Sequence, residues 1–291
     1  MLSRSNDLAA ALSSPPNDPQ TSPCHSYFGG RLRLRVPRDE AALQDIFKEA
    51  HRLVVQRRLR PESAEYDAAL RAEVPRLLEQ QPVFWSRLWP AGLALGKWLL
   101  AEPSLVASKC VLDIGAGLGP EGLCASLAGA SDTVVTDIEA KALGFVKQSA
   151  LDNGVESRLR TLPWNWNDPP PPQARGPFDV VLAGDVIYHT EHAPRLGELL
   201  VNGSLVKPGG FVIFSDSLER PYGENHQSEL CARLRAAQFE EVVSRDIDVG
   251  ADLEGASGVA GGRQVRLIVF SKPGGGPRSN RSTPRGRNRA G

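Results

Sequence analysis

The chain has 291 residues, and its 34 basic and 34 acidic residues give a formal net charge of zero at pH 7. This balance argues against a protein that binds nucleic acid over its whole surface, because such proteins are usually basic. A charged fraction of 23% and a hydrophobic fraction of 41% are typical of a soluble globular protein. No stretch reaches the ~18 uninterrupted apolar residues that a membrane span requires.

The two ends of the chain differ in composition from its middle. Residues 1–26 are polar and rich in proline, so we expect a disordered lead there. Residues 273–291 contain five arginines and no acid, which is typical of a flexible basic tail capable of weak contact with nucleic acid. The lead lacks the apolar core of a secretory signal and the arginine-rich composition of a transit peptide. We therefore expect a cytoplasmic protein, with organelle import as the open alternative.

Residues 27–100 are expected to form a strand and helices that pack on the core. Residues 27–36 alternate apolar and basic side chains, which predicts a short strand. Helical spacing of apolar residues predicts a helix over 39–58, and two further helices are expected over 62–80 and 93–100. None of these segments carries an obvious reactive group.

Residues 101–272 alternate between predicted strands and predicted helices. The first strand begins at Lys109 and ends in a Gly-rich turn. Further strands are expected at 132–137, 158–162, 178–185 and 209–216, and helices at 120–128, 140–153, 191–206 and 224–238. Two final strands, 240–249 and 263–272, are joined by a Gly-rich segment. This order predicts an α/β fold with a mostly parallel sheet, helices on both faces and one antiparallel strand at an edge.

The four cysteines give no sign of a metal site. Cys24, Cys110, Cys124 and Cys231 have no C-x-x-C spacing and no histidine nearby that would complete a set of ligands. We expect reduced, mostly packed thiols and no bound metal.

The most informative local pattern is the Gly-rich turn after the first strand. Gly115 and Gly117 follow an apolar run and precede a helix, which allows a tight turn and close approach of a ligand to the backbone. The turn lacks the third spaced glycine of a dinucleotide fingerprint. Glu121, in the first helical turn, would also oppose a pyrophosphate. Asp113, inside the strand, either touches a ligand or binds loop amides.

Two more carboxylates are expected at the same edge of the sheet, because the carboxyl ends of parallel strands form the ligand-binding crevice of open α/β sheets. Asp137 ends the next strand, 20 residues after Gly117, where an acidic side chain can accept both hydroxyls of a ribose. Asp185 ends the strand FDVVLAGD and is followed three residues later by Tyr188. A carboxylate after such an apolar run is costly unless it is paired or wet.

An ordered set of motifs resembles one family. Trp89-Pro-Ala-Gly92 precedes the strand, VLDIGAGLG forms the turn, and Asp137, Trp164 and Asp185-Val-Ile-Tyr188 follow. Over residues 85–239, about half of the chain, this set is similar to the family-16 branch of seven-strand methyltransferases that use S-adenosylmethionine. Most members of that branch methylate protein lysines. The stretch from Asp216 to His226 is loosely similar to members that act on electron-transfer flavoprotein.

The resemblance implies a class I, Rossmann-like methyltransferase with a twisted sheet of seven strands. It also implies residue roles: Trp89 lines the cofactor pocket, Gly115 and Gly117 pass its amino-acid part, and Asp137 holds the ribose. Trp164 lies near adenine, with Trp166 as a rival in the same stretch. Asp113 and Asp185 are also assigned to the cofactor, and Asp185 and Tyr188, as the catalytic pair, shape the slot where substrate meets the methyl group.

The expected function is therefore transfer of a methyl group to a lysine of a protein substrate, by a monomer. A small-molecule N- or O-methyltransferase on the same fold is the alternative. A nicotinamide-dependent oxidoreductase is disfavoured by the missing third glycine. A non-catalytic relative is disfavoured because the glycines and acids of the pattern are intact.

Overall fold

A computed structural model describes residues 18–37, 49–59, 63–80, 84–202, 204–219, 223–250 and 264–274. Most of the predicted N-terminal lead, the first half of the helix expected over 39–58, the Gly-rich segment before the last strand and the Arg-rich tail lie outside these residues. None of the helices in the described ranges has the length and apolar composition needed to cross a membrane.

The centre of the fold is a seven-stranded sheet in the order β5-β4-β3-β6-β7-β9-β8. The strands are β3 (Cys110–Ile114), β4 (Asp132–Asp137), β5 (Leu159–Pro163), β6 (Phe178–Gly184), β7 (Val206–Ser217), β8 (Glu240–Asp248) and β9 (Gln264–Ser271). β3 to β7 pair in parallel, and β9 runs antiparallel to both of its neighbours. The prediction of a mostly parallel α/β sheet is confirmed. The antiparallel strand lies second from the edge, because β9 is inserted between β7 and β8.

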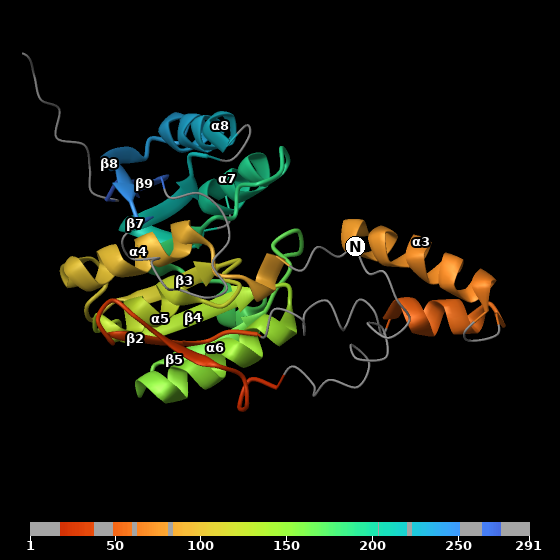
Figure 1. The fold of residues 1–291 in the computed structure, drawn as a ribbon. Coiled ribbons are helices and arrows are strands. Elements are labelled where there is room, and N and C mark those ends of the chain that lie inside the picture. Colours follow the sequence, from red (N-terminus) through yellow and green to blue (C-terminus); the bar gives the residue numbers. More distant parts are fainter. Residues whose placement is uncertain are drawn as a thin grey trace, which may run out of the picture.

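Helices cover both faces of the sheet (Figure 1). One face carries α4 (Pro90–Ala101), α5 (Pro120–Leu127) and α6 (Ala140–Asn153), and the other carries α7 (His192–Asn202) and α8 (Gly223–Ala236). The alternation of side chains along β6 shows why both faces are needed. Val180 and Leu182 pack in the core beneath α4, whereas Val181 and Ala183 pack in the core beneath α7 and α8. A strand that is apolar on both faces must be covered twice.

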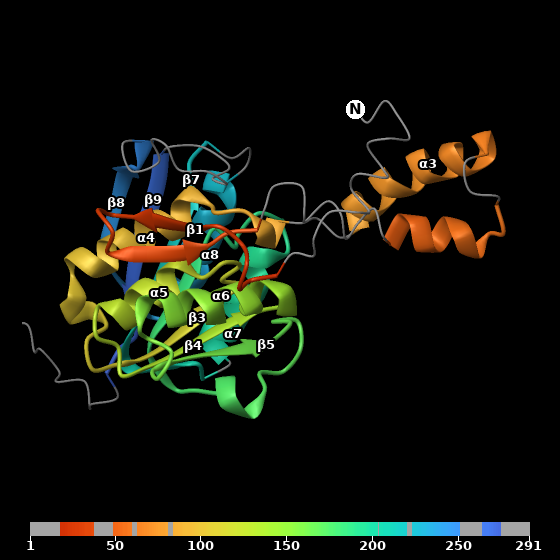
Figure 2. The same cartoon turned by 60° about the horizontal axis from the view of Figure 1, so that its bottom comes forward.

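The segment predicted as one strand over 27–36 is a hairpin of two. β1 (Cys24–Tyr27) pairs antiparallel with β2 (Leu32–Arg35), so the predicted disordered lead gives way to a strand before residue 26. Gly29 and Gly30 adopt φ values of 67° and 87°, which reverse the chain in a conformation that other residues rarely adopt. Figure 2 shows the hairpin lying across α5 and α6, and β2 contacts both helices.

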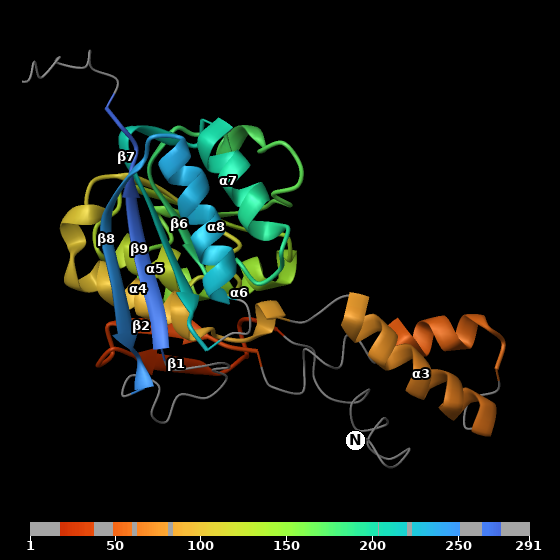
Figure 3. The same cartoon turned by 90° about the horizontal axis from the view of Figure 1, so that it is seen from above.

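A helical pair stands apart from this domain. Helical residues 49–56 pack on α3 (Ala64–Gln80) through a small core of their own, made by Ala50, Val54, Tyr66, Leu70 and Leu77. Figure 3 and the other two views show the pair away from the sheet. We expected the helices before residue 100 to pack on the core, and of these α4 does so.

The order of strands along the chain reverses between β3 and β6. β4 and β5 lie to one side of β3, and β6 and β7 lie to the other. The loops that follow β3 and β6 therefore diverge and leave a crevice at their carboxyl ends. The functional side chains predicted from the sequence follow these strands.

Candidate active site

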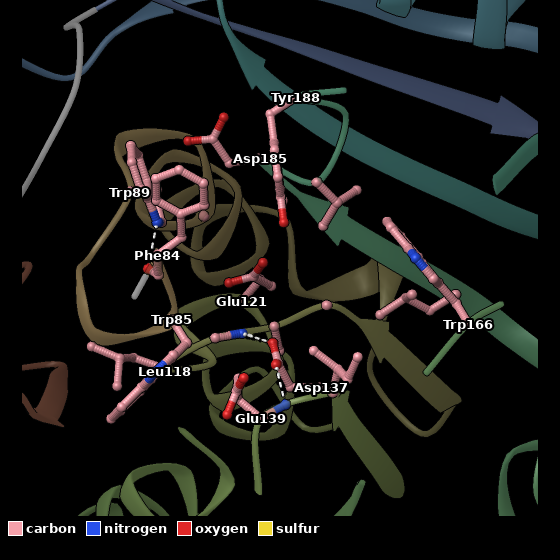
Figure 4. A pocket seen from close by; sticks show the side chains of 18 of the residues that line it. Phe84, Trp85, Trp89, Leu118, Glu121, Asp137, Glu139, Trp166, Asp185 and Tyr188 are labelled. Atoms are coloured by element: carbon pink, nitrogen blue, oxygen red, sulfur yellow. Dashed lines mark hydrogen bonds between the residues drawn. The ribbon is translucent and has the colours of Figure 1, made fainter. Parts of the chain in front are cut away.

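A cavity of about 610 Å³ opens at the carboxyl ends of β3, β4 and β6. Seven of the eight residues predicted for the site line it: Trp89, Gly115, Gly117, Asp137, Trp164, Asp185 and Tyr188. They come from five separate segments of the chain, four of which follow or end parallel strands of the sheet. Figure 4 shows the side chains that surround the cavity.

The Gly-rich turn forms one wall of the cavity. Gly115 and Gly117 have φ values of 67° and 54°, in the left-handed region that favours glycine. A Cβ atom on Gly115 would lie 3.0 Å from Cγ1 of Val186. Glycine at this position therefore allows the turn to pack against the loop that follows β6.

Asp137 ties the Gly-rich turn to the end of β4. Its Oδ2 accepts the backbone N–H of Gly117 at 2.7 Å, and its Oδ1 accepts that of Glu139 at 2.8 Å. The side chain is 7% exposed, and burial raises its pKa above the usual value although these amides favour the charged form. The carboxyl is thus held rigidly at the cavity wall, where it can accept hydrogen bonds from a ligand.

Asp113 does not line the cavity. It is fully buried, and its Oδ2 accepts the backbone N–H of Gly122 at 3.0 Å, in the first turn of α5. Strand alternation explains this, because Asp113 points to the same face as Val111, which α5 helps to cover. Burial, reinforced by the nearby Glu121, raises its pKa well above the usual value. Of the two roles left open by the sequence, the structure supports the structural one, although the amide that Asp113 binds belongs to the first turn of α5 and not to the loop.

Glu121 is one of the cavity residues that the sequence did not assign to the site. It is 1% exposed, yet its carboxyl lines the cavity from the first turn of α5. Burial, with Asp185 and Asp137 nearby, raises its pKa to about 8 although backbone amides oppose the shift. Its sequence position at a helix N-terminus fits an ordinary structural role as well, so only the fold reveals that it faces the cavity.

Asp185 lies opposite the Gly-rich turn in a left-handed conformation, with φ of 60°. Asp is one of the few residues that adopt this region without glycine's freedom. Its backbone N–H donates to the carbonyl of Ser215 at 2.8 Å, which fixes the turn, and the residue is 6% exposed. The turn aims the Asp185 side chain at the cavity that Glu121 also lines.

Three neighbouring aromatic rings line the cavity. Phe84 lies edge-on to Trp89 and to Tyr188, with ring centroids 5.8 Å and 5.5 Å apart. Nε1 of Trp89 donates to the carbonyl of Phe84 at 3.0 Å, which holds the two rings together. Phe84 is 41% exposed and Tyr188 is 37% exposed. We call Phe84, Trp89 and Tyr188 the aromatic collar; Phe84 was not predicted, because nothing near it in the sequence marks it.

His192 supports the collar from α7. Its ring lies 4.6 Å from that of Tyr188, and its Nδ1 is 2.8 Å from the carbonyl oxygen of Val186. Since a carbonyl only accepts, Nδ1 carries the hydrogen and donates. Burial lowers the pKa of the imidazole, so the ring is neutral at pH 7.

Both tryptophans of the PWNWND stretch line the cavity. Trp164 is 7% exposed, and its Nε1 donates to the carbonyl of Asp168 at 3.3 Å. Trp166 packs edge-on against His192 with centroids 5.3 Å apart. The sequence left the two as rivals, and the structure brings both to the same wall.

The charged lining of the cavity is mostly acidic. Its carboxyls belong to Glu121, Asp137, Glu139 and Asp185, and Arg87 supplies the guanidinium. Such a lining favours a ligand that carries positive charge and hydroxyl donors. Among the described residues, no group of three or more His, Cys, Asp or Glu side chains is arranged to hold a metal ion.

Known proteins match this chain over the residues that form the cavity. A family model described as "Lysine methyltransferase" matches residues 82–225. The electron transfer flavoprotein beta subunit lysine methyltransferase of Mus musculus is 33% identical over 119 residues, which cover 41% of this chain and 45% of that protein. The human protein of the same name is 41% identical over 118 residues, 40% of this chain and 43% of that protein.

A second group of relatives is matched over more of its length. The protein N-lysine methyltransferase METTL21A of Danio rerio is 30% identical over 176 residues, 57% of this chain and 78% of that protein. The match to the flavoprotein group spans less than half of those relatives' length. The stretch after Asp216 that is loosely similar to that group includes Arg220 and Pro221, which lie outside the described residues.

Proposed function

The chain belongs to the lysine methyltransferase family, and we propose that it transfers a methyl group from S-adenosylmethionine to the side-chain amine of a lysine in a protein substrate. The observation that carries this proposal is the aromatic collar, which opens onto an acidic cavity at the carboxyl ends of the strands. The family match covers the same part of the chain, from the collar to the loop after β7.

The lining of the cavity fits S-adenosylmethionine in its chemistry. Asp137 would accept the ribose hydroxyls, since its carboxyl faces the cavity and is held by two backbone amides. The backbone of Gly115 and Gly117 would contact the amino-acid part, because neither residue has a side chain to block it. Trp164 and Trp166 offer flat apolar surface for the adenine. When bound, the donor supplies a methyl group on a positively charged sulfur.

The aromatic collar fits a lysine side chain. Its aliphatic stem packs on aromatic surface, and an ammonium within about 6 Å of a ring centroid is attracted to the ring face. Phe84 and Tyr188 are the exposed members of the collar, so a substrate side chain can reach them from solvent. Three neighbouring rings in the lining offer apolar surface to a long, narrow side chain.

Two effects of the site prepare the amine. A lysine ammonium has an unperturbed pKa of ~10.4, and removal from water favours its neutral form. The Asp185 carboxyl can accept a hydrogen from the amine and so direct the nitrogen lone pair into the cavity. Alignment of this kind can lower a barrier by ~7–11 kcal/mol. Asp185 and Tyr188 are thus the proposed catalytic pair, and their roles stay predictions.

The substrate to test first is the electron transfer flavoprotein beta subunit, because the flavoprotein relatives are named for it. The full chain is incubated with methyl-labelled S-adenosylmethionine and this subunit, and the product is mapped by mass spectrometry. Label on a lysine of the subunit supports the proposal. Label on other proteins of an extract would support a protein lysine substrate but not this one.

Two controls give the assay its power. Asp185→Asn keeps a side chain that tolerates the left-handed backbone but removes the charge. Loss of label with Asp185→Asn and retention with Glu102→Gln, an exposed residue at the end of α4, would support the assigned site. Label found only in small metabolites would overturn the protein substrate in favour of a small-molecule methyltransferase.

A cytoplasmic location, a monomeric state and weak contact of the basic tail with nucleic acid stay predictions from the sequence.

A further inference from the structure

Glu121 occupies the floor of the cavity, in space that two glycines leave open. A Cβ atom on Gly184 would lie 2.3 Å from its Oε1, and one on Gly92 would lie 2.9 Å from its Oε2. These glycines belong to the end of β6 and to α4, so two separate elements make room for this carboxyl. Figure 4 shows the side chain directed toward the middle of the cavity, between Asp185 and Asp137 in that view.

The hydrogen bonding of this carboxyl is incomplete. Backbone N–H groups of Gly184 and of Glu121 itself donate to it, but buried Oε2 has no hydrogen-bond partner among the described residues. A buried carboxylate without a cationic partner is costly, so the group holds a proton in the protein alone. Consistent with this, burial raises its pKa to about 8.

Among the described residues, the charged groups that shift the pKa of Glu121 are acidic, and Arg87, which also lines the cavity, is not one of them. The titratable groups around Glu121 are Asp113 on β3, Asp137 at the end of β4, Asp185 after β6 and Cys124 one turn along α5. From α4, the contact with its carboxyl is made by uncharged Gly92. A positive charge that enters the cavity would therefore find a carboxyl that it can ionise.

We propose that Glu121 determines the charge specificity of the donor pocket: it ionises when the cationic methyl donor is bound, and so favours the donor over the neutral-sulfur product. The inference rests on the proposed function, because it takes S-adenosylmethionine as the ligand. The only bond that breaks is the O–H bond of the Glu121 carboxyl, and the proton passes to water. Methyl transfer removes one positive charge from sulfur, so the ionised carboxyl loses its partner and the product is held less tightly.

Two consequences can be measured without turnover. Donor binding below about pH 8 should release a proton, and donor affinity should rise with pH up to that value. S-adenosylhomocysteine keeps the ammonium group but not the sulfonium charge, so its binding should release less. Replacement of the carboxyl by an amide should reduce the preference for donor over product on the order of tenfold.

The test is calorimetric titration of the full chain with S-adenosylmethionine and S-adenosylhomocysteine between about pH 6 and pH 9. Phosphate and Tris buffers differ in ionisation enthalpy, so the two series together count the protons released. The same titrations on Glu121→Gln should show a reduced donor preference and no extra proton, with product affinity within about twofold of the wild type. Glu102→Gln serves as the matched control and should behave as the wild type.

The outcomes separate this inference from the proposed function. Equal proton release with donor and product, or an unchanged donor preference in Glu121→Gln, would overturn the role of Glu121 and leave the methyltransferase assignment standing. Binding of neither ligand to the wild type would overturn both. If Glu121→Gln does not fold, the proton count of the wild type still decides between the two results.

Discussion

The two ends of strand β4 carry the same residue type in opposite surroundings. Asp132 begins the strand, where its carboxylate is 39% exposed and lies 3.0 Å from the guanidinium of Arg160. Asp137 ends the strand, where it is 7% exposed and is held among the described residues by backbone N–H groups. At the start of the strand an exposed aspartate pairs with an arginine, whereas at its end a buried aspartate lies in the cavity wall.

The same contrast recurs along β6. Near its start, burial raises the pKa of Asp179, but hydrogen bonds from Lys207 and the backbone N–H of Cys110 outweigh it and lower the pKa overall. Beyond its end, Asp185 and Glu121 face the cavity together. Proteins retain costly buried polar groups chiefly at functional sites. The comparison therefore separates acids that serve the fold from acids that serve a ligand.

The largest effect is expected from a substitution of Asp137, at the carboxyl end of β4. Asp137→Ala removes the acceptor for the ribose hydroxyls and the anchor of Gly117, so affinity for S-adenosylhomocysteine should fall about 100-fold or more. Asp132→Ala, at the opposite end of the strand, is the matched control and should leave the Kd within about twofold. Calorimetric titration measures both. A similar loss of affinity in the two variants would contradict the distinction between the two ends of β4.

The next effect concerns β6. Asp185→Asn keeps a residue suited to φ of 60° but removes the charge that orients the amine, so kcat should fall roughly 10- to 100-fold. The Kd for S-adenosylhomocysteine should change little. Asp179→Asn at the start of β6 should leave kcat unchanged, since among the described residues its side chain binds Lys207 and the backbone N–H of Cys110 and does not line the cavity. Full turnover in Asp185→Asn under saturating substrate would remove the proposed role.

Gly184→Ala should lower the free energy of unfolding, because Gly184 leaves room for the carboxyl of Glu121. The new methyl group would lie 2.3 Å from Glu121 Oε1, so we expect about 1–3 kcal/mol of destabilisation in urea unfolding. Gly184→Ala combined with Glu121→Ala should recover part of that loss, because the clash is removed. A loss that is the same with and without the Glu121 side chain would show that the two residues are not coupled.

The smallest effect is the pH dependence of the free energy of unfolding. It has opposite signs for Glu121, which lines the cavity, and for Asp179, which pairs with Lys207 at the start of β6. Glu121 has a folded pKa of about 8 against ~4.3 when unfolded, so its favourable contribution is complete below ~4.3 and is lost as pH rises through 8. The lowered pKa of Asp179 contributes stability that is instead lost as pH falls. Between about pH 6 and pH 8.5 the free energy of unfolding should fall by about 1–3 kcal/mol, and Glu121→Gln should flatten this slope. A wild-type curve that rises with pH over this range would contradict the assignment.

Local patterns predicted the sheet well, because the signals that define it are local. β4 and α6 have the predicted bounds, since apolar runs and turn residues mark them directly. The alternation over 27–36 predicts one strand, whereas the structure has a hairpin, because Gly29 and Gly30 within that stretch adopt positive φ and turn the chain.

The site was predicted where sequence position alone fixes which end of a strand a residue occupies. That rule placed Asp137 and Asp185 at the cavity. It failed for Asp113, whose direction depends on the face of the strand, and strand alternation could have shown this. It also missed Glu121 and Phe84, because only tertiary packing brings the first turn of α5 and the aromatic collar to the same cavity.

The most direct test of the account is calorimetric titration of the full chain with S-adenosylhomocysteine, with NAD as the comparison. The acidic cavity without a phosphate-binding fingerprint predicts micromolar binding of S-adenosylhomocysteine, which Asp137→Ala weakens about 100-fold or more, and no binding of NAD. Binding of NAD in place of S-adenosylhomocysteine, or of neither ligand, would contradict the claim that the carboxyl ends of these strands form a methyl-donor pocket.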